Sequence, residues 1–319
     1  MILFLKCALV LVLLLLLAGV LFEQYSRLRL ERKWQGKTFV KIHNNKIHYV
    51  KKGQGDHTIV FQSGMGSSHF IWDEIQDSLS KKAVTISYDR NGLMYSDRTD
   101  ERATNDQVSD ELFQLLKKTN CPKPYILVGH SMAGIYMRPF IAQHHDDIKG
   151  IVFVEAAHPK QIEKASPALI KALQPPPRWL IKTAIHTGIY RAFFSFQQLN
   201  PEIPLKHPLG QLEKDFFFRS VDKTLEELAL DQQNFRDAEK YTDFGDIPLT
   251  VIMGMNEIRY RNFKNQALAE EYRSLVHTVQ HDLLQLSPHS KLVKAHNSGH
   301  IVQINDASLL VQEIEKLIR

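Results

Sequence analysis

The sequence contains little cysteine, and what it contains cannot build a disulfide framework. Among its 319 residues, Cys7 lies in an apolar leader and Cys121 stands alone in the body. The His-Glu-x-x-His pattern and the paired cysteines that hold zinc are missing, as is a dense basic run with interleaved aromatic residues. These absences argue against a metal centre and a nucleic-acid partner, and we expect no cofactor.

The remaining composition is typical of an ordinary globular enzyme. Hydrophobic residues make up 44% of the chain and charged residues 24%, with a net charge of +5. Beyond the leader, roughly 290 residues remain, which is enough for one sizeable α/β domain. Composition alone gives no function and no oligomeric state.

The first 22 residues are almost wholly apolar, interrupted only by Lys6. At about 1.5 Å per residue, a helix of this length just spans the roughly 30 Å hydrocarbon core of a bilayer. The alternative is a signal peptide that is cleaved to release a secreted or periplasmic protein. The segment 18–20, Ala-Gly-Val, lacks small residues at both positions that cleavage requires. We therefore expect a single-pass membrane anchor at 1–22, followed by a linker at 23–37.

The orientation of this anchor is weakly encoded. Four basic residues follow the apolar run and one precedes it, which by the positive-inside tendency leaves the body on the cytoplasmic side. The basic residues are Lys6 before the run, and Arg27, Arg29, Arg32 and Lys33 after it.

The body alternates short β-rich runs with helical patterns, which predicts a mostly parallel sheet covered by helices. It begins with a hairpin over 38–50, whose turn we place at Asn44-Asn45. The expected later strands are Thr58–Phe61, Val84–Tyr88, Tyr125–Val128, Ile151–Val154, Leu249–Met253 and Leu292–Val293. The expected helices are Asp106–Lys118, Ile135–His144 and Ala307–Ile318, the last closing one side of the sheet.

One interval lacks a clear strand. More than ninety residues separate the strand ending at Val154 from the strand beginning at Leu249, and this stretch is rich in proline and phenylalanine. A structureless loop of such length is improbable in a compact domain, so we expect a helical cap inserted at about 160–245. Each individual phenylalanine of the insertion is expected to pack it onto the sheet.

A strand, a small-residue turn and a helical pattern meet at Gly129-His130-Ser131-Met132-Ala133-Gly134. Such a turn raises a serine hydroxyl to the N-terminus of the next helix, where developing negative charge is stabilised. The usual glycine two residues after the serine is Ala133 here, with Gly134 following. The arrangement predicts Ser131 as a nucleophile.

Here the chain resembles the α/β-hydrolase family, from about residue 38 to the end. The resemblance implies a doubly wound, mostly parallel sheet with a helical cap. Ser63-Gly64-Met65-Gly66 looks like the family's oxyanion loop, with Ser63 where histidine is common. On this alignment the backbone N–H groups of Met65 and Met132 form the oxyanion hole. The Asp89-Arg90 loop is expected to be structural.

The same resemblance implies the other members of a catalytic triad. Ser298-Gly299-His300 matches the family's histidine loop, which makes His300 the general base, with His296 and His158 as rivals. The orienting acid is expected at Glu257, three residues after the glycine that ends the penultimate strand. Glu155, at the end of an earlier strand, is the alternative acid.

These residues imply acyl transfer through an acyl-enzyme on Ser131. We expect a carboxylic-ester hydrolase of the carboxylesterase or lipase class, and the anchor and Phe-rich insertion favour lipophilic acyl substrates. The alternatives are an amidase or proline-type aminopeptidase, a carbon–carbon bond hydrolase, or a catalytically silent binding protein. Dehalogenases and epoxide hydrolases of this type carry an aspartate nucleophile, so Ser131 argues against them.

Overall fold

A computed structural model describes residues 1–32, 36–204, 206–261 and 263–318 of the chain. It divides into two compact units. The first consists of Met1–Lys37 and Gln174–Phe218, and the second of Thr38–Leu173 and Arg219–Arg319. The second unit carries the β-sheet and every candidate residue of the triad.

The second unit is built on an eight-stranded sheet of order β1-β2-β4-β3-β5-β6-β7-β8. The strands β3 to β8 are parallel, and the β1–β2 hairpin joins antiparallel at the β4 edge. This topology confirms the predicted fold class. The strand bounds are β1 Phe39–Ile42, β2 Asn45–Lys52, β3 Thr58–Gln62, β4 Val84–Tyr88, β5 Tyr125–His130, β6 Ile148–Val154, β7 Leu249–Gly254 and β8 Ser290–Ala295.

The strand predictions hold to within a few residues because the central strands are buried along their whole length. Strands β3, β4, β5 and β7 expose none of their residues, as expected for parallel strands covered on both faces. The hairpin turn lies one residue earlier than predicted. Ile42 pairs with Asn45, and the left-handed backbone falls on His43, with φ of 50°.

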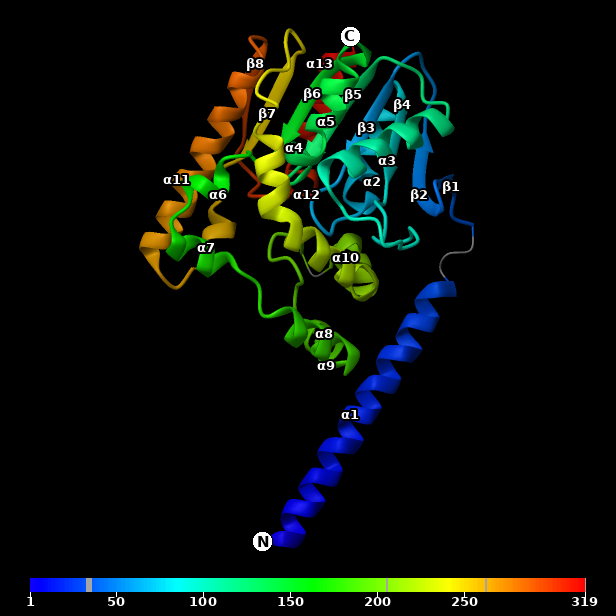
Figure 1. The fold of residues 1–319 in the computed structure, drawn as a ribbon, viewed down its shortest axis with the longest axis vertical. Helices are drawn as coiled ribbons and strands as arrows, with labels where there is room; N and C mark the ends of the chain where they lie inside the picture. Colours follow the sequence, from blue (N-terminus) through cyan, green and yellow to red (C-terminus); the bar gives the residue numbers. More distant parts are fainter. Residues whose placement is uncertain (33–35, 205, 262, 319) are drawn as a thin grey trace. The chain divides into compact units, whose positions relative to one another are not determined.

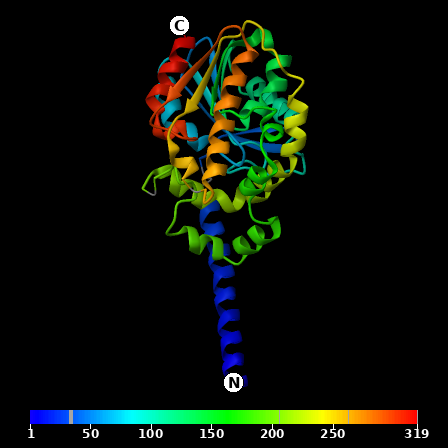
Figure 2. The ribbon, with the colours of Figure 1, turned by 90° about the vertical axis from the view of Figure 1, so that its left-hand side faces the viewer.

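Helices cover both faces of this sheet (Figures 1 and 2). Helix α13 packs against α2 and against β5 and β6, which confirms that the terminal helix closes one face, while α3 contacts α4 and α5. The bounds are η2 His69–Trp72, α2 Asp73–Leu79, α3 Asn105–Lys118, α4 Ala133–Tyr136, α5 Arg138–Gln143, η3 His145–Asp147, η4 Glu257–Tyr260, α11 Gln266–Asp282, η5 Leu283–Leu286, α12 Val302–Asn305 and α13 Ala307–Ile318.

The helix predicted over 135–144 is divided into α4 and α5. Pro139 lies in the first turn of α5, where its missing N–H costs nothing, but it cannot continue a preceding helix. Phe140 and Ile141 of α5 then join Leu112 and Leu115 of α3 in the buried core beside the sheet.

The interval between β6 and β7 is helical, as expected for the insertion. Its helices are α6 Gln161–Lys164, α7 Pro167–Leu173, α8 Arg178–His186, α9 Ile189–Phe194 and α10 Pro208–Ala238. Helices α8 and α9 and the part of α10 through Phe218 belong to the first unit. The rest of α10, with α6 and α7, belongs to the unit that carries the sheet.

Helix α1 runs from Ile2 to Glu31, beyond the predicted end at residue 22. Residues 23–31, expected as linker, therefore continue the helix, and Arg27 pairs with Glu23 one turn earlier at 2.7 Å. Predicted linker positions 33–35 lie outside the described residues. Among the described helices, α1 alone is long and apolar enough to cross a membrane, and an 18-residue stretch of it has a mean hydropathy of 2.9. An anchor and a signal peptide both fit this composition.

We expect the substitution Phe140→Ala to lower the free energy of unfolding by about 4 kcal/mol, because it leaves a cavity in the core. Phe140 is fully buried between α3 and the sheet. Phe196, which is 86% exposed, provides the matched control. Urea unfolding in mild detergent measures both, and equal losses for the two variants would contradict the placement of Phe140.

Candidate active site

Ser131 lies directly between β5 and α4 and has a strained backbone, with φ of 53°. Two hydrogen bonds hold this turn: the carbonyl of Ser131 accepts from the N–H of Gly134 at 3.0 Å and of Ala157 at 2.8 Å. Non-glycine residues seldom adopt such a conformation unless the surrounding structure fixes it, and strain of this kind gathers at functional sites. The turn has the geometry of a nucleophile elbow.

The glycines around Ser131 explain why Ala133 can replace the usual glycine. A Cβ on Gly134 would lie 2.6 Å from the carbonyl oxygen of Ala157, so this position must be glycine for α4 to meet the end of β6. A Cβ on Gly129 would lie 3.1 Å from the Cβ of Ala133. Ala133 therefore fits because the opposite residue has no side chain.

The predicted oxyanion loop lies against Ser131. A Cβ on Gly64 would come within 2.9 Å of the Ser131 Cβ, which places the loop backbone beside the candidate nucleophile. In the described part of the chain, neither Met65 nor Met132 donates its N–H to a backbone carbonyl. Both groups therefore remain suited to the oxyanion role assigned to them by resemblance.

A buried arginine, Arg90, fixes the backbone of this loop. Arg90 donates to the carbonyl oxygens of Ser63 at 2.6 Å and Gly64 at 2.8 Å. Because a trans peptide directs its C=O and N–H oppositely, the N–H of Met65 faces away from Arg90. Arg90 is 3% exposed and donates to backbone carbonyls, which agrees with the structural role expected for its loop.

Glu227 of α10 completes this support and was missed from the sequence. Its carboxylate is fully buried, pairs with Arg90 at 2.9 Å and accepts the N–H of Gly66 at 2.8 Å. A Cβ on Gly66 would overlap Thr224, one turn earlier on α10. The sequence offered no signal, because Glu227 lies in a helix with several other acidic residues.

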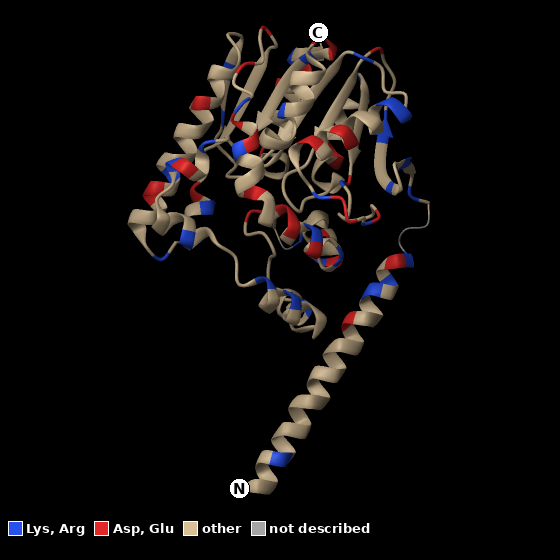
Figure 3. Cartoon of the chain, viewed as in Figure 1, with Lys and Arg blue, Asp and Glu red and all other residues tan. Residues whose placement is uncertain are grey.

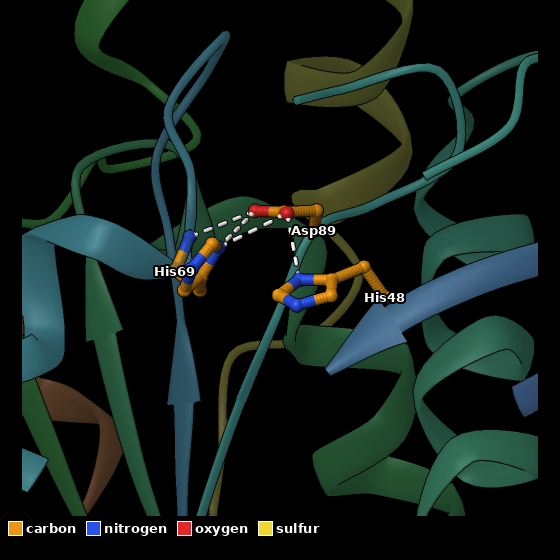
Figure 4. A group of neighbouring side chains, drawn as sticks. All are labelled: His48, His69 and Asp89. Atoms are coloured by element: carbon orange, nitrogen blue, oxygen red, sulfur yellow. Dashed lines mark hydrogen bonds and ion pairs between the residues drawn. The ribbon is translucent and has the colours of Figure 1, made fainter. Parts of the chain in front are cut away.

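Asp89, the residue before Arg90 in the sequence, contacts two histidines (Figure 4). Its buried carboxylate lies 3.0 Å from Nδ1 of His48 on β2 and 2.9 Å from Nδ1 of His69 on η2. It also accepts the backbone N–H of His69 at 2.9 Å. Burial acts to raise the pKa of Asp89, but the two histidines outweigh it and hold that pKa well below its ordinary value.

These three side chains could in principle hold a metal ion, since their ligand atoms lie within 4.8 Å of one another. However, both histidines already direct Nδ1 at the carboxylate, so the polar groups satisfy each other without an ion. We interpret the cluster as a hydrogen-bond network that connects β2, η2 and the loop after β4.

His300 lies beside the alternative acid. Its Nδ1 is 3.4 Å from Oε2 of Glu155, which follows β6 with φ of 47° and a side chain that is 1% exposed. The other oxygen, Oε1, accepts the N–H of Gly254 at 2.6 Å. A Cβ on Gly254 would overlap the carbonyl of Gly299, so the end of β7 packs directly against the histidine loop.

Glu257, the acid expected from the sequence, has a different partner. It begins η4, its side chain is half exposed, and it pairs with Arg273 of α11. Of the two acids that the sequence left open, the structure thus brings Glu155 to His300 and leaves Glu257 in a surface ion pair. Glu257 does lie three residues after the glycine that ends β7, as expected. However, the 3₁₀ turn η4, capped by Asn256, begins at Glu257 and determines where its side chain lies.

Arg259 is a further site residue that sequence reasoning missed. Its guanidinium pairs with Glu155 and lies 3.3 Å from Nδ1 of His300 and 3.1 Å from the hydroxyl of Tyr272. Burial acts to raise the pKa of Glu155, but Arg259 and His300 outweigh it and lower that pKa. The carboxyl is therefore an anion at neutral pH.

The buried side chain of His130 contacts the loop that carries His300. Its Nε2 lies 2.9 Å from the carbonyl oxygen of His300, and the two rings are 4.6 Å apart. Burial lowers the pKa of His130 to about 3, so the ring is neutral and donates its Nε2 proton. The rival bases lie elsewhere: Nδ1 of His158 accepts the N–H of Lys160, and His296 is exposed.

The sequence profile of the alpha/beta hydrolase fold matches residues 57–307. The chain belongs to the α/β-hydrolase family. A probable transporter of Hormonema carpetanum is 27% identical to this hydrolase over an alignment of length 294, which covers 84% of this chain and 40% of that protein. The hydrolase spans less than half of the length of the first three curated relatives that it matches.

Solved structures share the fold of this hydrolase. A thermophilic esterase of Thermogutta terrifontis superposes with a TM-score of 0.60 at 16% identity, covering 89% of this chain and 97% of the esterase. A haloalkane dehalogenase of Agrobacterium tumefaciens superposes with a TM-score of 0.62 at 17% identity, covering 88% and 96%. At such identities the likeness concerns the fold alone.

We expect Asp89→Asn to lower the free energy of unfolding by about 3 kcal/mol at pH 7, because two buried histidines lose their anionic partner. Since the folded-state pKa of Asp89 is depressed, its stabilisation is complete above the unfolded pKa of about 3.9 and is lost as the pH falls through the lower folded value. Urea unfolding should therefore show a constant difference between the two proteins from pH 7 to about pH 4 and a shrinking difference from there to about pH 2, whereas a difference that stays constant below pH 4 would count against this role.

Glu227→Gln should reduce kcat by about 10²-fold in a folded protein, because the oxyanion loop loses its anionic anchor. Glu226→Gln is the matched control, since Glu226 pairs with the half-exposed Arg98 instead. The measurement is ester hydrolysis beside circular dichroism. Equal activity of the two variants would sink this assignment.

Proposed function

We propose that this hydrolase cleaves carboxylic esters through an acyl-enzyme on Ser131. The observation that carries the proposal is the strained Ser131 turn, with φ of 53° and the glycine loop at Gly64 packed against the serine side chain. A serine raised in this way between a strand and a helix is what acyl transfer on this fold requires. A thermophilic esterase shares this fold, which is therefore compatible with the same chemistry.

In the proposed reaction, His300 takes the proton of the Ser131 hydroxyl, and the oxygen attacks the ester carbonyl. The N–H groups of Met65 and Met132 stabilise the oxyanion of the tetrahedral intermediate. His300 then protonates the leaving alcohol. A water molecule, deprotonated by His300, hydrolyses the acyl-enzyme and releases the acid and free Ser131.

We assign the orienting acid to Glu155 in preference to Glu257. Support comes from the 3.4 Å separation between Glu155 and Nδ1 of His300 and from the lowered pKa of this carboxyl, which keeps it anionic. An anion at Nδ1 holds the ring in the tautomer that accepts a proton and stabilises the imidazolium that follows. Arg259 shares the carboxylate and fixes its position.

Lipophilic acyl groups are the proposed substrates. The side chains of the two oxyanion residues contribute to an apolar cluster with Ala157 of the β6 loop and Leu230 of α10. Such surroundings favour an acyl chain over a charged group. We further propose that α1 anchors the hydrolase in a membrane, where esters of this class are concentrated.

Ser131→Ala should abolish hydrolysis of p-nitrophenyl esters, a loss of about 10⁴-fold or more in kcat, because no other nucleophile replaces the hydroxyl. A fluorophosphonate probe should label the wild type and not the variant. Activity should rise with acyl-chain length at equal substrate concentration. A folded wild type that is neither labelled nor active on any ester would favour an amidase or a silent binding protein.

Glu155→Gln should reduce kcat by about 10³-fold or more, whereas Glu257→Gln should leave it within about two-fold of the wild type. Each variant removes one negative charge. Glu155 lies beside His300, whereas Glu257 lies in a surface ion pair. Steady-state kinetics on the preferred ester separates them. The reverse result would restore Glu257 as the orienting acid.

A further inference from the structure

Helix α9 turns an apolar face outward. Ile189, Ala192, Phe193 and Phe196, at and just beyond this helix, follow the i, i+3, i+4, i+7 spacing of a single helical face, and all four are exposed. The exposed fraction reaches 55% for Phe193 and 86% for Phe196. A helix at a water surface shows the opposite pattern, so this face fits a partner that is itself apolar.

Helix α8, which precedes α9 through a two-residue turn, continues this surface. Trp179 is 68% exposed and Leu180 is 45% exposed, and basic Arg178 and Lys182 lie beside them. Exposed aromatic and aliphatic residues flanked by Arg and Lys are typical of helices that lie in a membrane interface. We call residues 178–196 the α8–α9 hairpin.

The inner face of the hairpin is fixed to α1 by a buried ion pair. Arg191 of α9 lies 2.7 Å from Glu23 of α1, whose side chain is fully buried, and its guanidinium stacks 3.6 Å from the ring of Phe218. Removing either charge would leave the other buried without a partner, which is costly. On α9, Arg191 thus faces α1, whereas Ile189, Ala192 and Phe193 are exposed.

A glycine contact sets the level at which the hairpin meets α1. Gly188, with φ of 72°, forms the turn between α8 and α9, and a Cβ there would overlap the carbonyl of Gly19 on α1. Gly19 lies three residues before Phe22, the last residue of the apolar run, which is about 4.5 Å along the helix axis. The turn therefore meets α1 within its apolar run, before the charged residues at its C-terminal end begin (Figure 3).

Past this level, charged side chains join the apolar ones. A cavity of about 370 Å³ lies between α1, α9 and α10, lined by Arg29 and Lys214 together with Tyr25 and Phe194. Cationic and aromatic side chains are those that proteins place at the depth of phospholipid headgroups. The first unit therefore has an apolar band along α1 up to Phe22. Toward the C-terminal end of α1 it has a zone with the side chains that suit phospholipid headgroups.

From this banding we propose that the α8–α9 hairpin is embedded beside α1 in one leaflet of a phospholipid bilayer. This inference rests on the proposed anchoring by α1, because the bilayer is chosen over a second copy of the chain for its continuity with the apolar surface of α1. The insertion is shallow, at the boundary of headgroups and acyl chains. The cap of the hydrolase is then a membrane-bound element in its own right.

The test places an environment-sensitive fluorophore on the full-length protein in phosphatidylcholine vesicles that contain nitroxide-labelled lipid. The background is Cys7→Ala, since Cys121 is buried. Phe196→Cys reports on the hairpin, Leu13→Cys on the middle of α1, and Asp146→Cys, on a fully exposed side chain of the other unit, is the matched control. Circular dichroism checks that each variant is folded.

We expect shallow nitroxides to lower the emission at position 196 about two-fold or more, with position 146 unchanged and position 13 quenched by deep nitroxides. Quenching at 13 but not at 196 would overturn the hairpin inference and leave the anchor intact. Loss of quenching at both would overturn the anchor as well. Quenching at 196 alone would support a hairpin in the interface beside a helix that does not span. Iodide in the aqueous phase serves as a second quencher. If neither the nitroxide lipids nor iodide lower the emission at position 196, a second copy of the chain covers it, which also overturns the inference.

Discussion

The left-handed backbone of Ser131 is the constraint on which the candidate site depends. A residue with a side chain adopts this conformation only where its neighbours allow no alternative. Those neighbours are small for this reason: Gly64, Gly129 and Gly134 each approach another group so closely that a methyl group would collide with it. The hydrogen bonds from Gly134 and Ala157 then hold the turn. Ser131, the loop at Gly64 and the end of β6 are positioned together by one strained turn.

Two networks of buried charged residues fix the segments that surround this turn. Asp89 joins β2 and η2 to the loop after β4, and Arg90, its neighbour in sequence, joins the oxyanion loop to Glu227 of α10. Adjacent residues of opposite charge thus face two different sets of partners. Each charge is buried but fully engaged, which is the condition under which buried charge is tolerated in a protein interior.

The sequence predicted well those features that depend on local pattern. Strand β5 and the turn at Ser131 were found because a β-rich run, small residues and a helical pattern follow one another, and His300 was found by its place after β8. The hairpin turn and the division of α4 from α5 were off by small amounts that depend on single residues, His43 and Pro139. Local chemistry was sufficient for these elements.

Features that depend on distant partners could not be predicted in the same way. Both Glu155 and Glu257 follow strands that end at the same edge of the sheet, so spacing could not decide which carboxylate meets His300. Arg259 contacts Glu155, 104 positions away, and His300, 41 positions away, while Glu227 pairs with Arg90, 137 positions away. The buried pair of Glu23 with Arg191, a residue of the insertion, likewise joins positions that local pattern cannot connect.

The contact between Gly254 and the carbonyl of Gly299 has a consequence for redesign of this hydrolase. Any side chain at residue 254 displaces the loop that carries His300, so position 254 tolerates no diversity in a mutant library. By contrast, Leu230 and Phe235 of α10 belong to the same apolar cluster as Met132, with Met65 packed against it. Under the proposed function, variation aimed at a new acyl-chain preference therefore belongs on α10, where an apolar side chain can change while the backbone around Ser131 stays in place.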